Sequence, residues 1–133
     1  MKTLFVAGLL LSSTAFAYNQ ADVTTLLETK SCVGCDLQAA DLKQANLVGA
    51  DLRGADLTGA NLNLARLNEA DLSGAILTGA NLDHARIDHA TLRGADLRDT
   101  SCQATNFRNS DLSGALTEGW DITWANLQGA ELP

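Results

Sequence analysis

The sequence of 133 residues is poor in aromatic side chains, which make up only 5% of it. An ordinary globular core is therefore doubtful, because aromatic residues supply much of the buried area in such cores. Basic residues are also scarce, with nine Lys and Arg against sixteen Asp and Glu. This balance argues against non-specific binding of nucleic acid or anionic lipid, since both require a basic surface. It permits an acidic surface that meets a basic partner.

No segment after residue 17 is apolar enough to cross a membrane. Residues 1–17 themselves resemble an export signal. Lys2 provides the positive start, residues 4–11 are apolar, and Ala15 and Ala17 occupy the small positions of a cleavage site. We expect cleavage after Ala17 and an exported chain of residues 18–133 in the periplasm, the thylakoid lumen or the medium. An uncleaved anchor is the weaker alternative, because a span needs about 20 apolar residues.

A strict five-residue period replaces the usual patterns of helices and strands. A large residue, mostly Leu, recurs at twenty positions from Leu37 to Leu132 without insertion or deletion. The residue two positions earlier is Ala in fifteen of the twenty units, an Asp or Asn usually stands between, and Gly is frequent two positions later. An α-helix would rotate successive Leu by about 140°, and a flat strand would alternate their faces. A backbone that turns one corner per unit directs both the small residue and the Leu inward.

Units such as 50–54 (ADLRG) and 55–59 (ADLTG) resemble the A(D/N)LXX signature of pentapeptide-repeat proteins, and the resemblance extends from Cys35 to Pro133. It implies an all-β solenoid, namely a right-handed quadrilateral β-helix with four units per coil and hence about five coils. We expect three segments: a signal peptide (1–17), a capping helix with the CxxC segment (18–34) and the β-helix (35–133). Gly at the corners suits a turn that requires positive φ.

The segment before the repeats predicts a short helix over residues 19–29. Asn19 or Asp22 would cap its N-terminus, and Val23, Leu26 and Leu27 would form one apolar stripe. We expect this helix to cover the first coil. An amphipathic membrane anchor is the alternative, although the helix lacks a basic face.

The cysteine pattern has three interpretations. In an exported protein, Cys32 and Cys35 favour a local disulfide. Thioredoxin-type chemistry would require this motif at a helix N-terminus in an α/β unit, and zinc would require two further ligands nearby. Cys102 occupies a central Leu position and is expected to be a small buried hydrophobic residue.

Residues twenty apart would stack into columns if four units form a coil. Three of the four faces are then acidic, and the fourth carries Arg66, Arg86 and Arg108 and is nearly neutral. This fourth face is a candidate interaction surface. Trp120 and Trp124, near the C-terminus, would form either a hydrophobic cap over the end of the core or an aromatic binding patch for a sugar or peptide.

No arrangement of residues typical of catalysis is present, and the Asp spacings follow from the repeat itself. His84 and His89 fall at successive corners, where we expect solvation. We predict a protein that is not an enzyme, uses no cofactor or metal, has no membrane span after cleavage and does not bind nucleic acid directly. Its partner would be another protein, which it serves as a scaffold.

Two other functions remain open. The resemblance implies an acidic DNA mimic that binds a topoisomerase such as DNA gyrase, although the export signal and the lack of a C-terminal dimerisation helix oppose it. A thiol-active protein using Cys32 and Cys35 is the third hypothesis.

Overall fold

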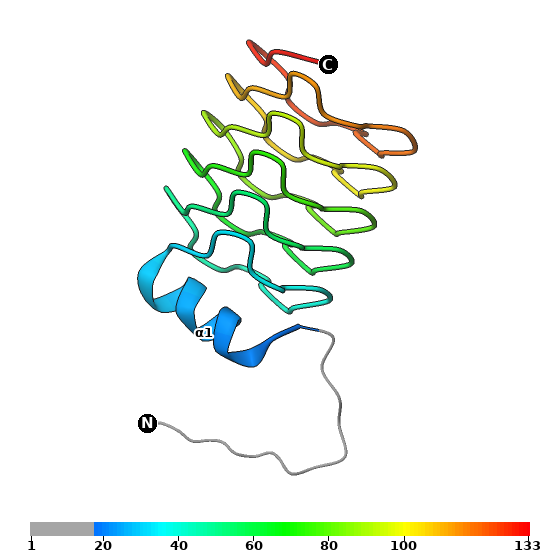
Figure 1. Cartoon of the computed structure of the whole chain (residues 1–133). Helices are drawn as coiled ribbons and strands as arrows, with labels where there is room; N and C mark the ends of the chain where they lie inside the picture. The colour runs from blue at the N-terminus through cyan, green and yellow to red at the C-terminus, as the bar shows by residue number, and fades with distance from the viewer. Residues whose placement is uncertain (1–17) are drawn as a thin grey trace.

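From Ser31 to the C-terminus, the backbone rises in coils stacked one upon another (Figure 1). The computed structural model describes residues 18–133, so the expected signal peptide lies outside the described residues. Parallel bridges join residues twenty positions apart, from Ser31 with Asp51 to Asp111 with Glu131. Twenty residues, or four five-residue units, therefore make one coil.

A corner follows each inward Leu. The carbonyl oxygen of Leu57, for example, accepts a hydrogen bond from the N–H of Ala60 at 2.9 Å. The residue two positions after the Leu has positive φ in every unit from Gly34 to Gly129, whether or not it is Gly. A turn with positive φ at its third residue alone is type II.

Neighbouring coils are joined by backbone hydrogen bonds on both sides of each bridge. Leu57 N–H donates to the carbonyl of Ile76 at 2.6 Å, and Ile76 N–H donates to that of Ala55 at 2.9 Å. Since a corner returns every five residues, the extended part of each unit is short. In residues 18–133 the bridges are accordingly isolated ones, with no longer strand.

The inward positions form one continuous core. From Leu37 to Leu112 the central residue of every unit is buried, and the small residues from Ala40 to Ala115 are buried with them except Ala45, which is partly buried. The prediction that both point at the axis is confirmed. Each fully buried Leu contributes about 1.5–3 kcal/mol. Burial decreases in the last coil, where Leu132 is 53% exposed.

The Asp or Asn before each central residue has a structural task at the corner. Its Oδ1 accepts a hydrogen bond from the N–H two residues later, as Asp56 does from Thr58 at 3.0 Å. All thirteen Asp and Asn residues at this position from Asp36 to Asn126 make this bond. These are Asx-turns, which tie the side chain to its own corner.

Helix α1, Gln20–Thr29, lies against the first coil (Figure 1). Asn19 caps it by accepting hydrogen bonds from two backbone N–H groups of the first turn. Val23 and Leu26 are buried in the core, whereas Leu27 is 44% exposed, so the predicted stripe is wrong at Leu27. Val23 and Leu26 therefore form the side of α1 that meets the core, and Leu27 lies outside that side.

The repeat geometry begins one unit earlier than the sequence pattern. Ser31 bridges to Asp51, Cys32 is buried in a central position, and Gly34 has positive φ like every later corner residue. The CxxC segment is therefore part of the first coil rather than of the helical segment.

Candidate interaction surface

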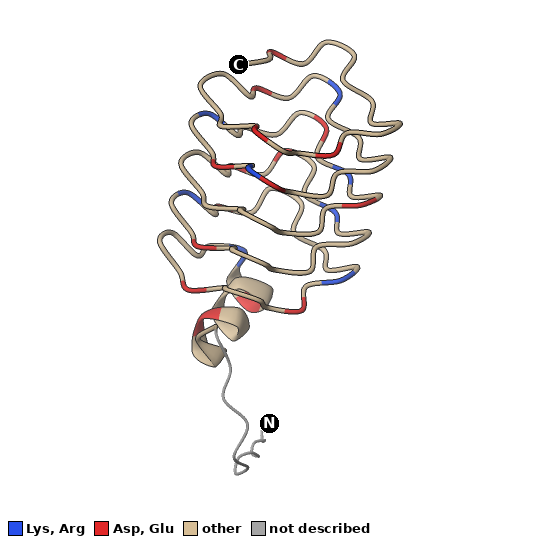
Figure 2. Cartoon of the chain, turned by 90° about the vertical axis from the view of Figure 1, so that its right-hand side faces the viewer, with Lys and Arg blue, Asp and Glu red and all other residues tan. Residues whose placement is uncertain are grey.

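One of the four faces differs from the others in its chemistry. We call it the arginine face, and its bridging column is Asn46, Arg66, Arg86, Asn106 and Asn126. Of the four columns in residues 18–133, this is the one that contains no carboxylate. Acidic residues recur on coil after coil, and basic residues are fewer (Figure 2).

Arg66 and Arg86 stand directly above one another as bridge partners in successive coils. Both are exposed, and each occupies a position where Asp or Asn elsewhere closes the corner with an Asx-turn. A hydrogen bond of this kind contributes about 0.5–1.5 kcal/mol. The two arginines thus replace residues that would stabilise the fold, and they place like charges next to each other.

The arginines of the other faces are neutralised within the protein. Arg53 makes two hydrogen bonds to Asp51, the shorter at 2.7 Å, and Arg98 makes two to Asp96, the shorter at 2.6 Å. Arg93 pairs with Asp111 at 3.0 Å.

The arginine face lacks such close pairs. Arg86 Nε lies 3.9 Å from Asp88 Oδ1, and within residues 18–133 Arg66 and Arg108 form no ion pair. The arginine face therefore exposes positive charge that no close ion pair within residues 18–133 neutralises.

Asp88 is already occupied by other donors. It accepts hydrogen bonds from the Asn68 and Asn106 amides, and His89 Nδ1 lies 3.4 Å from its second oxygen. Partial burial acts to raise the pKa of Asp88, but the hydrogen bonds from Asn68 and His89 outweigh it and hold the pKa below its ordinary value. The Asp88 carboxylate therefore stays ionised, and it lies closer to the amides of Asn68 and Asn106 than to Arg86.

The corners on either side of the arginine face carry side chains at the positive-φ position. They are formed by the columns Gln44, Leu64, His84, Ala104, Trp124 and Gly49, Glu69, His89, Asn109, Gly129. Eight of these ten residues are not Gly. At the two other corners the reverse holds, and eight of the ten residues are Gly. A non-Gly residue in this conformation costs about 1–2 kcal/mol. Residues that keep a strained backbone conformation on the surface often serve a function, because the strain brings no stability.

The two tryptophans lie in different environments. Trp120 is half-buried against the core, with its ring centroid 6.0 Å from that of Phe107. Trp124 is 84% exposed with φ 60°, at the corner that leads into the arginine face. The arginines and Trp124 thus share one side of the molecule, and Trp120 does not join them. His84 and His89 are exposed at corners of the same side.

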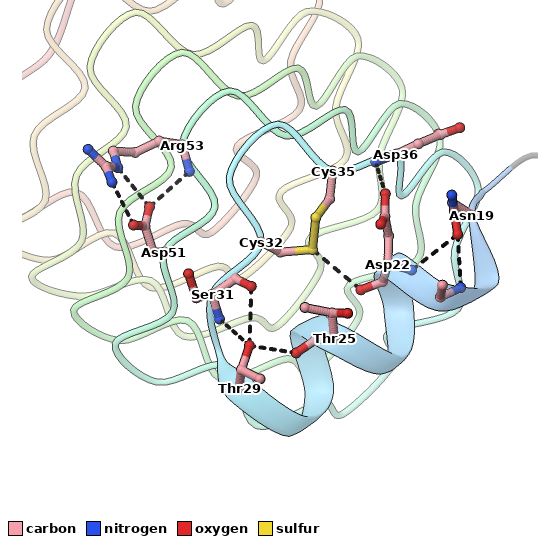
Figure 3. Close-up of a disulfide and its surroundings, with 11 residues drawn as sticks. Asn19, Asp22, Thr25, Thr29, Ser31, Cys32, Cys35, Asp36, Asp51 and Arg53 are labelled. Atoms are coloured by element: carbon pink, nitrogen blue, oxygen red, sulfur yellow. Dashed lines mark hydrogen bonds and ion pairs between the residues drawn. A yellow bond between two sulfur atoms is a disulfide. The ribbon is translucent and has the colours of Figure 1, made fainter.

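The structure joins Cys32 and Cys35 in a disulfide with Cα atoms 5.3 Å apart (Figure 3). Cys32 Sγ lies 3.3 Å from the carbonyl oxygen of Asp22, and the Asp22 carboxylate accepts a hydrogen bond from Asp36 N–H at 2.9 Å. The disulfide therefore lies at the junction of α1 and the first coil. Burial raises the pKa of the free thiol of Cys102 to about 12.

Other kinds of site have no support in the described part of the chain. Residues 18–133 contain no group of three or more His, Cys, Asp or Glu side chains placed to hold a metal ion. Over the same range, no helix combines the length and apolar character that spanning a bilayer requires.

Comparison with known proteins identifies the repeats. The family model for pentapeptide repeats matches residues 35–74 and 75–114. A pentapeptide repeat protein from Nostoc PCC 7120 is 30% identical over 85% of this chain and 74% of its own, with a TM-score of 0.56. Rfr23, from the cyanobacterium Cyanothece 51142, is 25% identical over 85% of this chain and 94% of its own, with a TM-score of 0.46.

A third related structure is a protein of the Arabidopsis thaliana thylakoid lumen, 28% identical over 84% of this chain and 72% of its own, with a TM-score of 0.41. Among curated protein sequences, none matches this chain.

Proposed function

This chain belongs to the pentapeptide-repeat family, and we propose that it is a non-catalytic, exported member that binds another protein through its arginine face. Proteins of this family fold as right-handed quadrilateral β-helices and are generally not catalysts. A rigid solenoid of this kind offers flat, regular sides on which a partner can be held.

One observation carries the proposal, namely the stacking of Arg66 on Arg86 with no close counter-ion. These residues give up the Asx-turns of their corners, and the corners beside them accept non-Gly residues at positive φ. Both features cost stability and neither contributes to the core. A binding partner gives a reason for both.

Export and the ends of the solenoid complete the proposal. Residues 1–17 would direct the chain to the periplasm, the thylakoid lumen or the medium and would then be removed. Helix α1 would close the lower end of a β-helix of about five coils, because Val23 and Leu26 cover the first inward residues. Capping of this kind keeps a solenoid from exposing its core.

Protein capture from the native extracytoplasmic extract tests the proposal. The immobilised chain is compared with Arg66→Gln/Arg86→Gln and with the matched control Arg53→Gln/Arg93→Gln, which removes two charges from another face. We expect the wild type and the control to retain the same partner and the first variant to lose it. Recovery of no specific partner by the wild type would refute the proposed function.

The second candidate is a DNA mimic that binds a topoisomerase such as DNA gyrase. The observation that favours it is the acidic character of the three other columns, in two of which carboxylates occupy successive coils, as at Asp36 with Asp56 and at Asp51 with Asp71. A supercoiling assay decides the matter. Inhibition or protection of gyrase at micromolar protein would support this candidate over the first, and export of the chain with Tyr18 as its first residue would oppose it.

A further inference from the structure

We infer that the partner element held by the arginine face is an acidic peptide segment, whose carboxylates pair with Arg66 and Arg86. This inference rests on the proposed function and adds the chemistry of the partner to it. The inference follows from the charges that the protein leaves unpaired and from the apolar residues beside them.

The first step is the arrangement of like charge. Bridge partners in adjacent coils are separated by about 4.8 Å, so the two side chains begin next to each other. Like charges that lie close together repel each other even in water. An anion placed between them turns this repulsion into attraction to a shared counter-charge.

The second step is that the protein does not supply this anion. Asp88, the carboxylate closest to Arg86, is held by two neutral amides and His89, and Arg86 reaches it only at 3.9 Å. Arg66 forms no ion pair within residues 18–133. The chain has sixteen acidic residues, yet its close arginine–carboxylate pairs are made by Arg53, Arg93 and Arg98, none of which lies on the arginine face.

The third step selects a peptide rather than a polyanion. The formal net charge of the chain is −7, and the three other columns carry carboxylates, so a long nucleic acid or an anionic membrane would be repelled outside the arginine face. A short acidic segment is confined to that face. Guanidinium groups bind carboxylates in a bidentate, planar geometry that favours such a segment.

The fourth step concerns the apolar residues at the corner beside the arginines. Leu64 is 44% exposed two residues before Arg66, and Trp124 is 84% exposed in the same corner column. Three coils separate them, which is about 14 Å along the axis. A free anion would make no use of these side chains. A peptide about five residues long in an extended conformation would span them, with acidic side chains directed to Arg66 and Arg86.

Side-chain NMR tests the inference at the level of single arginines. The ¹⁵N-labelled chain of residues 18–133 is titrated at low salt with a decapeptide of Glu, with a DNA strand of the same charge and with phosphatidylglycerol vesicles. We expect the Glu decapeptide to shift the Nε–H signals of Arg66 and Arg86. The signals of Arg53 and Arg98 serve as internal controls and should not move.

Variants and salt sharpen the result. Arg66→Gln/Arg86→Gln should weaken binding of the decapeptide at least tenfold, Arg53→Gln/Arg93→Gln should leave it unchanged, and Arg66→Lys/Arg86→Lys should retain part of it. Rising salt should abolish the shifts. An absent response, an equal response of all arginines, or a stronger response to the DNA strand or the vesicles would overturn the inference.

The two proposals fail in different ways. If the capture experiment returns a partner whose binding is lost in Arg66→Gln/Arg86→Gln but resists excess Glu decapeptide, the proposed function stands and the acidic-segment inference is wrong. If capture returns no partner although the decapeptide binds, the inference about the surface stands and the proposed function is wrong.

Discussion

The indole of Trp120 packs against the ring of Phe107, with the ring centroids 6.0 Å apart and the planes tilted by 53°. Phe107 is fully buried, so Trp120 covers the core where the last coil leaves it open. Trp124, only four residues later, is 84% exposed. Trp120 therefore lies where a cap over the core would lie, because it occupies an inward position, whereas Trp124 lies at a corner and covers no core.

Replacement of each tryptophan by Ala should separate these roles. We expect Trp120→Ala to lower the free energy of unfolding by about 1–3 kcal/mol, because a half-buried aromatic contact is lost. Trp124→Ala should change it by less than about 0.5 kcal/mol, as is usual for exposed sites. Chemical denaturation of both variants measures the difference. Equal effects of the two changes would contradict this assignment.

The inward Ala residues leave no room for a larger side chain. Ala65 is fully buried in a middle coil with coils above and below it. Ala65→Leu should therefore destabilise the protein by about 1–3 kcal/mol through overpacking. Lys43→Leu, which places the same side chain at an exposed position, is the control and should have little effect. A thermal melting curve of Ala65→Leu that coincides with that of the wild type would disprove this placement.

The core could be predicted from the sequence because the five-residue period leaves only one way for Leu57 and Leu62 to share an interior. Both are fully buried, as expected. The sequence pattern does not identify Cys32 as a central residue, because its unit has neither Ala nor Leu. The bridge from Ser31 to Asp51 depends on backbone register, and the signal that could have found it is the twenty-residue spacing extended one step backwards.

The sequence predicts the outward position of the Asp and Asn residues but not their hydrogen bonds at the corners. The repeat pattern predicts them as outward polar residues, which they are, but it does not predict their hydrogen bonds to the corner N–H groups. The spacing of an Asp or Asn two residues before a turn position is the known signature of an Asx-turn and could have indicated them. Arg66 and Arg86 depart from this signature, because an arginine side chain has no acceptor for the hydrogen bond from the corner N–H.

Polar residues in the upper part of the core show how the fold accepts departures from Ala. Thr105 is fully buried, and its Oγ1 donates a hydrogen bond to the carbonyl of Leu82 at 2.7 Å. Ser110 donates likewise to Phe107 at 2.6 Å. A buried hydroxyl group is tolerated when it is bonded in this way. Sequence alone gives the residue but not the carbonyl that satisfies it.

A glycine at one corner lies against the side chain of the coil below. The Asp99 carboxylate occupies the space that a Cβ at Gly119 would need, and Gly119 has φ +76°. At Gly74, with φ +67°, this space is open. We expect Gly74→Ala to cost about 1 kcal/mol through backbone strain alone and Gly119→Ala to cost more. Unfolding measurements on both variants check the order.

The double variant Asp99→Ala/Gly119→Ala supplies the control for this contact. Removal of the carboxylate should reduce the effect of Gly119→Ala to that of Gly74→Ala. An effect of Gly119→Ala no larger than that of Gly74→Ala in the wild-type background would show that Asp99 moves aside without cost.

The three cysteines should respond to alkylation in three distinct ways. The folded protein should take up no iodoacetamide, because Cys32 and Cys35 are joined and the Cys102 thiol is buried with its pKa raised to about 12. Unfolding without reductant should expose one thiol, and unfolding with reductant all three. Mass spectrometry counts the adducts. Labelling of two cysteines before unfolding would show that the disulfide is absent.

The ion pair of Asp96 with Arg98 predicts how stability depends on pH. Hydrogen bonds from the Arg98 side chain, with smaller help from its backbone N–H and its charge, lower the pKa of Asp96 from 3.8 to about 2. A pKa lowered by folding contributes stability above the unfolded value, and this contribution is lost as the pH falls through the folded value. The loss should therefore occur between about pH 4 and pH 2.

Asp96→Asn isolates this effect, because the amide can still accept the corner hydrogen bond that Asp96 Oδ1 accepts from Arg98 N–H but carries no charge. At pH 6 the variant should be less stable than the wild type by less than about 1 kcal/mol, since the pair is near the surface and screened by solvent. Most of this difference in stability should be lost by pH 2, where about half of Asp96 is protonated. Urea titrations at pH 6, 4, 3 and 2 measure the gap. A gap that stays constant down to pH 2 would mean that the charge of Asp96 does not stabilise the fold, and that its hydrogen bonds alone hold the corner.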